Sequence, residues 1–208
     1  MSTCMSIHRA LAEIKLYDKR IYDLINERFV RAEKVRYTKI DGVDRDQLEQ
    51  IMKSNLQKLM AIMANRQKLK SAIAESNQRT MVTIGGIEMT VTDAIEQKNY
   101  LAVRQTVLSN LRSQFNRANA EVLSYENNFQ SGLEKYINAS IRETANEELI
   151  ASLTKSYKEI NEVELINPCE LHKVIDKMSK EISDFENEVD YVLSESNAVT
   201  IIEVDLVS

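Results

Sequence analysis

The residues most able to do chemistry in this sequence are its few histidines and cysteines. Cys169 and His172 lie three positions apart and could face the same way on one helical turn, but two ligands are too few for a zinc site. His8 and His172 are the only histidines, and neither belongs to an H-E-x-x-H sequence. We expect structural roles for these residues, and we predict no metal site and no cofactor.

Two common enzyme motifs are also missing. The sequence contains no G-x-S-x-G, and its Gly85-Gly86 pair lacks the Gly-Lys-Ser/Thr ending of a phosphate-binding loop. The 32 Asp and Glu residues offer many accidental carboxylate pairs, but no pattern singles one out. We therefore predict no catalytic residues, and we expect that the protein is not an enzyme.

Four residues form the best candidate for a ligand-binding site. They are Arg79, Asn99, Tyr100 and Arg104, which lie close to the start of a predicted helix. A helix N-terminus combined with arginine side chains can bind an anion. The predicted ligand is a small anionic molecule of the nucleotide type. The alternative is that these arginines are ordinary solvated or ion-paired side chains.

Composition indicates which elements position these residues. The chain has 208 residues, four Gly, one Pro and a net charge of −5. Average proteins contain about 7% Gly and about 5% Pro, so this chain has few turns and few loops. Cys4 and Cys169 imply no disulfide framework, and the sequence shows neither a secretory signal nor an apolar run that could span a membrane. We expect a cytoplasmic protein with no membrane partner.

Apolar residues spaced by threes and fours predict four long helices. Ser6 is the expected N-cap of the first, and Asp41-Gly42 the expected turn before the second, so that these two helices pack antiparallel. The pair Asp93 and Glu96 is a capping-box pattern at the start of the third helix, which Gly132 is expected to end or bend. The predicted helices span residues 6–37, 44–78, 93–131 and 168–194.

Two β-structures are predicted between and after the helices. Residues 80–91 are two β-branched runs around Gly85-Gly86, which indicates a hairpin with positive φ at both glycines. Residues 198–207 are strongly β-prone and need a partner: residues 163–166, the hairpin, or a strand from another subunit. The predicted fold is mainly α, a coiled-coil-like bundle of long antiparallel helices with a small β-hairpin and a C-terminal strand.

The predicted organisation has two parts, which we expect to pack as one unit. Residues 1–131 hold the helical hairpin, the β-hairpin and the third helix, and residues 132–208 hold a helical extension, the fourth helix and the strand. Whether residues 133–160 form one helix or two is open. Asn167-Pro168 is expected to open the fourth helix, with Asn as its cap.

Several features of the predicted helices indicate contacts between chains. Asp18, Asn55 and Arg66 interrupt the apolar seams and are candidates to fix register in an assembly. Residues 1–92 carry a net charge of +5 and residues 93–208 of −10, so the halves either pack on each other or form opposite poles of an assembly. A second apolar stripe on the second helix contains Ile51, Leu56, Met60 and Met63. The methionine face of this helix, Met52, Met60 and Met63, is expected in a core or a subunit interface, with an adaptable binding groove as the alternative.

Part of the chain resembles a known family. Residues 72–120, with Asn77, the Gly85-Gly86 turn, Thr92-Asp93 and Arg104, are similar to an uncharacterised family of small helical proteins from bacteria and their phages, some labelled septicolysin. The resemblance implies a compact helical homo-oligomer without an established activity. It directs attention to the base of the hairpin and to Arg104. The acidic C-terminal part departs from the shorter family members.

The resulting functional hypothesis is a self-assembling, non-catalytic protein that acts by binding or scaffolding in a bacterial or phage setting. One alternative is a phage anti-defence protein that sequesters a nucleotide-derived immune signal between subunits. Another is a structural or assembly component of a phage. Nucleic acid is not an expected partner, because the chain is acidic and lacks a run of Lys and Arg.

Overall fold

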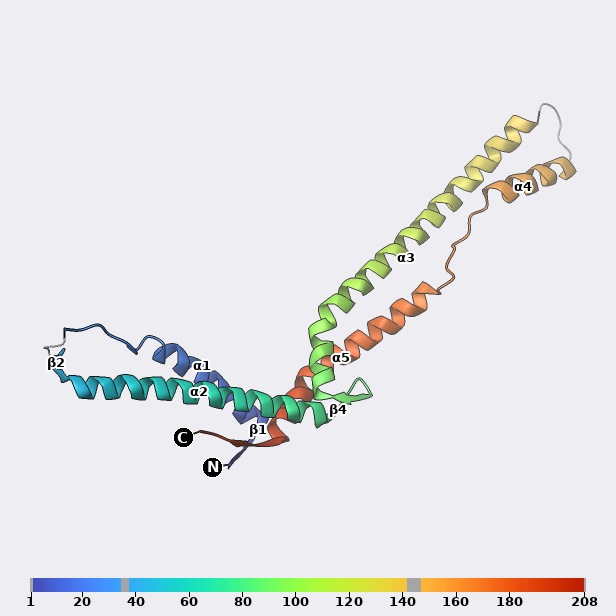
Figure 1. Ribbon diagram of the computed structural model, residues 1–208. Helices are drawn as coiled ribbons and strands as arrows, with labels where there is room; N and C mark the ends of the chain where they lie inside the picture. The colour runs from blue at the N-terminus through green and yellow to red at the C-terminus, as the bar shows by residue number, and fades with distance from the viewer. Residues whose placement is uncertain (1, 35–37, 142–146, 208) are drawn as a thin grey trace. The chain divides into compact units, whose positions relative to one another are not determined.

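The computed structural model describes residues 2–34, 38–141 and 147–207, and these residues are mainly helical (Figure 1). Helices comprise 74% of the described residues, which confirms the predicted fold class. The five helices in these ranges are α1 Ile7–Leu24, α2 Arg45–Arg79, α3 Val91–Ser140, α4 Glu147–Asn161 and α5 Leu171–Val199. The strands are β1 Ser2–Ser6, β2 Lys39–Ile40, β3 Val43–Asp44, β4 Met81–Ile84, β5 Ile87–Thr90 and β6 Ile201–Asp205.

The chain divides into two compact units. Unit 1 comprises residues 1–99 together with residues 184–208, and unit 2 comprises residues 100–183. The helices α3 and α5 each contribute one part to each unit. No helix in the described part of the chain is both long enough and apolar enough to cross a lipid bilayer.

In unit 1, the strand β6 pairs antiparallel with β1, so that Ser6 lies opposite Ile201 and Ser2 opposite Asp205. The C-terminal strand therefore pairs with the N-terminal strand of the same chain, and neither residues 163–166 nor the hairpin is its partner. Pairing with a strand from another subunit stays a prediction. The sequence of residues 2–6 lacks the alternation of apolar and polar residues that predicts a strand, and only Met5 of β1 is buried. The core beneath this sheet consists of Met5, Ile7, Ala10, Ile14, Tyr17, Leu69, Ile73, Ile202 and Val204.

The helix α1 begins where predicted, since the Ser6 side chain accepts a hydrogen bond from the Arg9 backbone N–H at 3.3 Å. It ends at Leu24, however, and the predicted continuation to residue 37 was wrong; residues 35–37 lie outside the described residues. The Asn26 side chain donates to the Tyr22 carbonyl at 2.9 Å and satisfies this acceptor in the last turn of the helix. Beyond it, Val30 is 85% exposed and finds no apolar surface to cover it.

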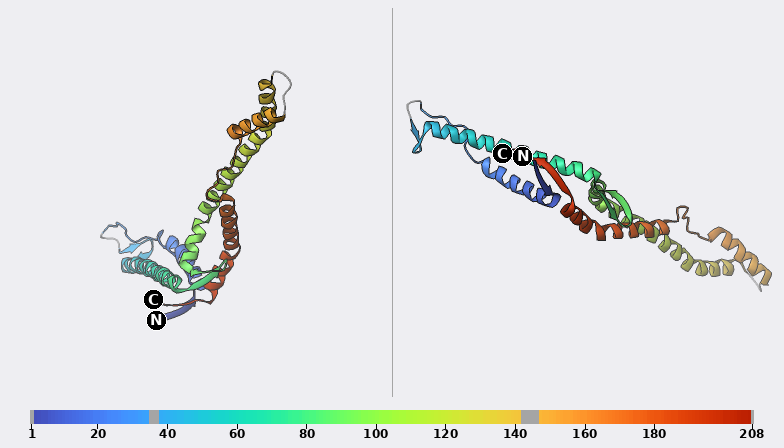
Figure 2. Two further views of the ribbon diagram at one scale, coloured as in Figure 1. Left: turned by 90° about the vertical axis from the view of Figure 1, so that its right-hand side faces the viewer. Right: turned by 90° about the horizontal axis from the view of Figure 1, so that it is seen from below.

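The predicted turn at Asp41-Gly42 is confirmed. Asp41 and Gly42 have φ of 52° and 84°, and they join the two-residue strands β2 and β3. Asp44 occupies the N-cap position of α2, although its side chain makes no capping hydrogen bond. From there α2 runs back along α1, as Figures 1 and 2 show, and this confirms the antiparallel helix pair.

The hairpin of β4 and β5 is confirmed, with φ of 59° at Gly85 and 75° at Gly86. The Gly85 N–H donates to a carboxylate oxygen of Glu188 on α5 at 2.7 Å. A Cβ at Gly85 would lie 3.5 Å from the Cβ of Asp184, so the turn packs directly on α5. The hairpin thus rests on a helix, as a two-stranded sheet must to be stable.

The start of α3 differs from the predicted capping box. Thr90 is the cap: its hydroxyl accepts from the Asp93 N–H at 3.0 Å and donates to the Asp93 carboxylate at 2.7 Å. Asp93 therefore takes the position expected of Glu96, three residues after the cap. The prediction was displaced because Asp is itself a common cap, and only the end of β5 shows that Thr90 precedes the helix.

The helix α3 continues through Gly132 to Ser140, so the predicted end at residue 131 was wrong. Gly132 keeps helical backbone and leaves room for a side chain of α4. A Cβ at this position would lie 2.1 Å from the Tyr157 hydroxyl oxygen. The ring of Tyr157 lies between Phe129 and Tyr136, with centroid distances of 5.2 and 5.3 Å. Residues 133–160 thus contribute to two helices, and residues 142–146 lie outside the described part.

The rest of unit 2 is held by apolar contacts between α3 and α5, which confirm the predicted α3 seam only as far as Phe115. Tyr125, farther along the predicted α3 seam, is 61% exposed. The buried residues of this core are Leu108, Ile175 and Ile182. Half-buried residues extend it along both helices: Leu101, Leu111, Phe115, Leu171 and Met178.

The segment before α5 is not a strand, so residues 163–166, named above as a candidate strand partner, do not form one. The Asn167 side chain accepts from the Leu171 N–H at 2.8 Å, but it lies four residues before the helix begins, so the predicted position of Asn167 as the adjacent N-cap was wrong. Glu170 has φ of 47° and separates Asn167 from the helix, which begins at Leu171 rather than 168. The helix ends at Val199 instead of 194, and Thr200 leads into β6.

Candidate functional site

The four predicted ligand-binding residues lie at the end of α2 and in the first part of α3. The Arg79 guanidinium forms an ion pair with Glu75, and the Arg104 guanidinium pairs with Glu181 at 3.0 Å. Asn99 and Tyr100 are exposed, Tyr100 by 53%. Both guanidinium groups thus already have carboxylate partners, and the ligand site at these four residues stays a prediction.

The N-terminus of α3 also carries a negative charge of its own. Asp93 lies in the first turn, where its carboxylate accepts from the Thr90 hydroxyl. The Val91 N–H is used by the Thr80 carbonyl at 2.9 Å. An incoming anion would meet a carboxylate beside these N–H groups, which weakens the electrostatic case for an anion site at this helix end.

The polar residues of the predicted seams make contacts within one chain. Asp18 of α1 pairs with Arg66 of α2 through two nitrogen atoms, and this hydrogen bonding raises the pKa of the Arg66 guanidinium. The Asn55 amide lies 3.5 Å from a carboxylate oxygen of Glu27, at the limit of hydrogen bonding. Of these contacts, the Asp18–Arg66 pair links α1 to α2; a role between chains stays a prediction.

The most prominent candidate surface of unit 1 is an apolar stripe on α2. Leu56, Met60 and Met63 are 47%, 59% and 48% exposed. At about 100° per residue they lie within a 60° arc, on the side of α2 opposite Leu69. We call these three residues the α2 stripe. Ile51 is also 48% exposed, but it lies on the other side of the helix.

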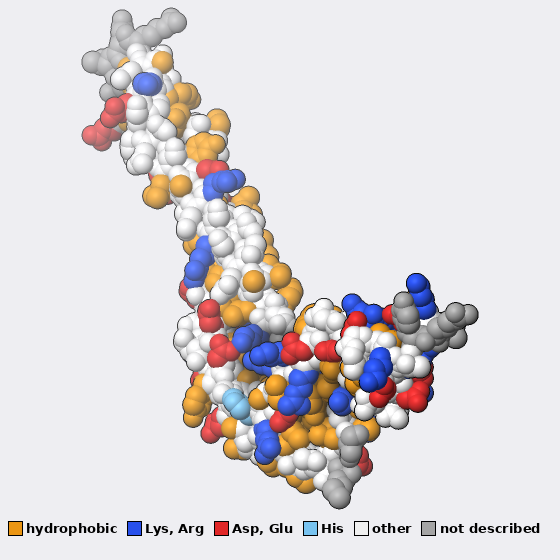
Figure 3. Space-filling model, turned by 90° about the vertical axis from the view of Figure 1, so that its left-hand side faces the viewer, with side chains coloured by type: hydrophobic (Ala, Val, Ile, Leu, Met, Phe, Trp, Pro, Cys, Tyr) orange, Lys and Arg blue, Asp and Glu red, His pale blue; other side chains and the backbone are white. Residues whose placement is uncertain are grey.

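Unit 2 exposes apolar side chains along its length as well (Figure 3). On α3, Leu123 and Tyr125 are 58% and 61% exposed, and Ile160 of α4 is 80% exposed. Monomeric proteins scatter single apolar residues over their surfaces, but contiguous patches mark contacts with other molecules.

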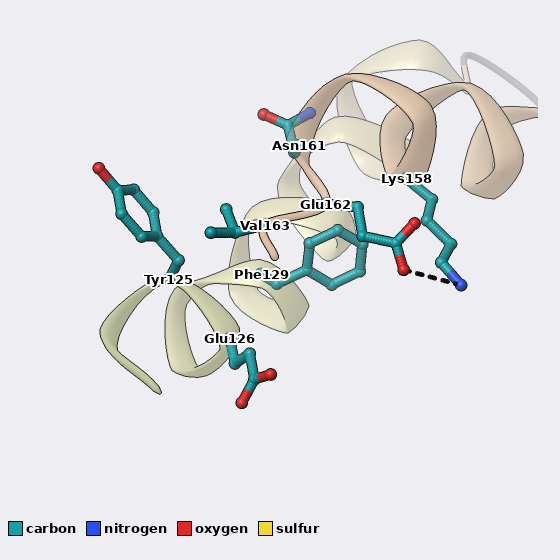
Figure 4. Close-up of a pocket in the computed structure, with 7 residues that line it drawn as sticks. All are labelled: Tyr125, Glu126, Phe129, Lys158, Asn161, Glu162 and Val163. Atoms are coloured by element: carbon teal, nitrogen blue, oxygen red, sulfur yellow. Dashed lines mark ion pairs between the residues drawn. The ribbon is translucent and has the colours of Figure 1, made fainter. Parts of the chain in front are cut away.

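A small pocket lies between α3 and the end of α4 (Figure 4). Its volume is about 170 Å³, and its walls include the rings of Tyr125 and Phe129. Lys158 pairs with Glu162 at 3.2 Å at one edge, while Glu126 lies at another. The pocket is too small for most organic ligands, whose sites measure about 300–1,000 Å³.

The described residues contain no group of three or more His, Cys, Asp or Glu side chains placed to hold a metal ion. Cys4 and Cys169 are both exposed free thiols. The His172 ring instead lies 6.2 Å from that of Phe115, so it takes part in the packing between α3 and α5.

Sequence reasoning missed one buried polar residue, Asn65 of α2. Asn65 is 7% exposed. Its side chain forms two hydrogen bonds with Val207: it donates to the Val207 carbonyl at 2.8 Å and accepts from the Val207 N–H at 2.7 Å. Lys68 donates to the Asp205 carbonyl at 2.7 Å beside it. In the sequence, Asn65 is distinguished only by its position next to the apolar seam of α2, and ordinary surface residues occupy such positions as well.

Comparison of the chain with protein families, with curated proteins and with solved structures finds no match. The resemblance of residues 72–120 to a family of small helical proteins therefore stays a prediction.

Proposed function

We propose that this protein is a non-catalytic helical protein that assembles with copies of itself and acts by binding or scaffolding. The observation that carries the proposal is the α2 stripe. Three large apolar side chains are 47–59% exposed on consecutive turns, opposite the face that α1 covers. Burying a fully exposed side chain of this kind gains about 1.5–3 kcal/mol, and about half of that gain remains for each of these residues, which favours a helical partner over water.

The charges around the stripe indicate which face of a second copy would cover it. Residues 50–74 contain five Lys and Arg and no Asp or Glu. Two stripes packed antiparallel about the midpoint of Met60 and Met63 would bring Lys53 of one chain beside Lys70 of the other. That arrangement is unfavourable, because like charges repel.

An acidic helical face is the better match, and the chain has one in the same unit. Residues 184–195 of α5 contain five Asp and Glu and no Lys or Arg. Within this segment Glu188, Tyr191 and Glu195 are exposed and spaced by three and four, so they share one side of the helix. A contact between the α2 stripe of one copy and this face of the next is head-to-tail, and repetition gives a ring or a filament.

The setting we propose is the bacterial cytoplasm, including a phage-infected cell. It rests on the resemblance of residues 72–120 to small helical proteins of bacteria and phages. A role in phage structure or assembly is a specific form of the same proposal, since it too requires self-assembly without turnover.

The test is the mass of the purified chain by size-exclusion chromatography with light scattering. We expect a mass several times the 23.9 kDa of one chain. The double variant Met60→Glu/Met63→Glu places two charges in the stripe and should lower that mass. Gln50→Glu/Gln57→Glu is the matched control, because it adds the same charge on an exposed side of α2 away from the stripe.

A native chain that runs as a 23.9 kDa monomer would overturn the proposal. So would a mass that neither double variant changes, or one that both variants lower equally, since the effect would then come from net charge. A reversal of the stripe charges, Lys53→Glu/Lys70→Glu, should also weaken assembly, and the added variant Glu195→Lys should partly restore it.

The alternative, sequestration of a nucleotide-derived signal between subunits, has weaker support. Its predicted contacts Arg79 and Arg104 are engaged by Glu75 and Glu181. It would gain support if a thermal-shift screen of cyclic and ADP-ribose-type nucleotides stabilised the chain. At a ligand concentration of 100 times the Kd, about 2.7 kcal/mol of stabilisation is expected.

A further inference from the structure

Unit 1 contains a groove that the proposed assembly does not use. It lies between α1, the first two turns of α3 and the C-terminal half of α5, and its volume is about 440 Å³. Sites for small organic molecules measure about 300–1,000 Å³. Three segments far apart in the sequence form it, and none of them contributes to the α2 stripe.

The floor of the groove is apolar. Leu11 of α1, Val91 and Ile95 of α3, and Leu193 of α5 line it. Val91 is 2% exposed and therefore belongs to the packed interior, whereas Ile95 remains 39% exposed. A flat apolar group placed here would cover side chains that now face water.

The Lys and Asp side chains that line the groove carry a net positive charge. Lys98 pairs with Asp190, the one carboxylate that lines the groove. Lys15 also lines it and has no ion-pair partner within residues 2–34, 38–141 and 147–207. His8 lines the groove as well.

Two neutral polar side chains complete the lining. Ser194 and Asn197 of α5 face the groove, and neither makes a side-chain hydrogen bond within the described chain. They supply donors and acceptors for the polar end of a ligand without breaking an existing bond.

We infer that this groove binds a small organic anion with a flat apolar body, such as an aromatic carboxylate or phosphate ester. The apolar floor takes the body, and Lys15 pairs with the acidic group, which Ser194 and Asn197 also reach. A neutral apolar molecule would leave Lys15 unpaired, and a cation would be repelled by it. The inference does not depend on self-assembly.

Equilibrium dialysis of the full chain against three probes tests it. The probes are 2-naphthoate, the neutral 2-naphthalenemethanol, and acetate, which has the charge without the body. We expect one 2-naphthoate per chain, binding about tenfold more tightly than the neutral probe, as one charge-assisted hydrogen bond provides. Acetate should not bind measurably.

Variants locate the site. Lys15→Gln should weaken 2-naphthoate binding about tenfold and leave the neutral probe unchanged, while Lys58→Gln, an equal charge change on α2, should affect neither. Ala12→Phe fills the groove from an exposed helical position and should abolish binding of both naphthalene probes. Ala102→Phe, an exposed alanine on α3 outside the groove, is its control.

Three results would overturn the inference. The first is no binding of 2-naphthoate at millimolar concentration. The second is binding that Ala12→Phe leaves intact, because the probe would then occupy another apolar surface. The third is equal weakening by Lys15→Gln and Lys58→Gln. The light-scattering mass of each variant, measured in parallel, separates a failure of this inference from a failure of self-assembly.

Discussion

Asn65 ties the C-terminal segment to α2, and its removal should measurably destabilise unit 1. Asn65→Ala deletes both hydrogen bonds with Val207, at 2.8 and 2.7 Å. Each is worth about 0.5–1.5 kcal/mol, so the loss is about 1–3 kcal/mol. Alanine is a better helix former than asparagine by several tenths of a kcal/mol, which offsets part of this loss.

The control for that offset is Asn55→Ala, ten residues earlier on α2. Asn55 has only a marginal contact, 3.5 Å from Glu27, but it gives the same gain in helix propensity. We therefore expect Asn55→Ala to be neutral or slightly stabilising in urea unfolding of the full chain. The free energy of unfolding of Asn65→Ala should lie about 1–3 kcal/mol below that of this control.

Two further measurements separate the hydrogen bonds from simple loss of packing. Hydrogen exchange of the Val207 amide should accelerate in Asn65→Ala, because the Asn65 carbonyl oxygen is its acceptor. Asn65→Asp keeps that acceptor but sets a carboxylate oxygen against the Val207 carbonyl. It should destabilise more than alanine at neutral pH and recover below pH of about 4, where the acid is protonated and can donate. Equal stability of Asn65→Ala and Asn55→Ala would refute this reasoning.

Two other contacts give predictions of the same kind. Gly132→Ala should destabilise unit 2: the gain of about 1 kcal/mol in helix propensity is outweighed by overpacking, typically about 1–3 kcal/mol, against the hydroxyl of Tyr157. In a chain that already carries Tyr157→Ala, Gly132→Ala should become stabilising. Thermal unfolding of the native chain, the two single variants and the double variant measures the coupling between the two positions. Effects on stability that simply add would contradict the clash. Arg31 hydrogen-bonds the Asp41 carboxylate and lowers its pKa, so this pair stabilises the folded state above the ordinary carboxyl pKa and is lost as pH falls. Arg31→Gln should raise the Asp41 pKa toward the ordinary value in an NMR titration, and an unchanged midpoint would show that Arg31 is not the cause.

The features that the sequence predicted correctly depend on residues close together in the chain. Positive φ at Gly85 and Gly86, the turn at Asp41-Gly42 and the Ser6 cap each follow from one or two residue types. The seams of α5 and of α3 as far as Phe115 were also predictable, because a period of three and four residues repeats over many turns.

Several features could not be predicted because they depend on contacts between distant residues. Nothing near residues 2–6 shows that they pair with residues 201–205, and nothing near Gly132 shows that Tyr157 fills the space above it. The groove between α1, α3 and α5 could not be predicted for the same reason. Its residues become neighbours only after three separate segments have packed.

The early end of α1 has the largest consequence for function. A first helix that reached residue 37 would cover most of α2, whereas α1 ends at Leu24 and, at 1.5 Å per residue, spans about 27 Å against about 50 Å for α2. The seam of α2 reflects this difference: Leu69 is fully buried near the start of α1, while Leu48 and Leu59 toward the other end are only half-buried. The apolar surface in the first half of α2 thus lacks a helical partner from α1 on its seam side, and the α2 stripe is open on the opposite side. Apolar side chains exposed to water on two sides of a helix carry a free-energy cost that contact with a second chain would remove, and our proposal of self-assembly rests on this cost.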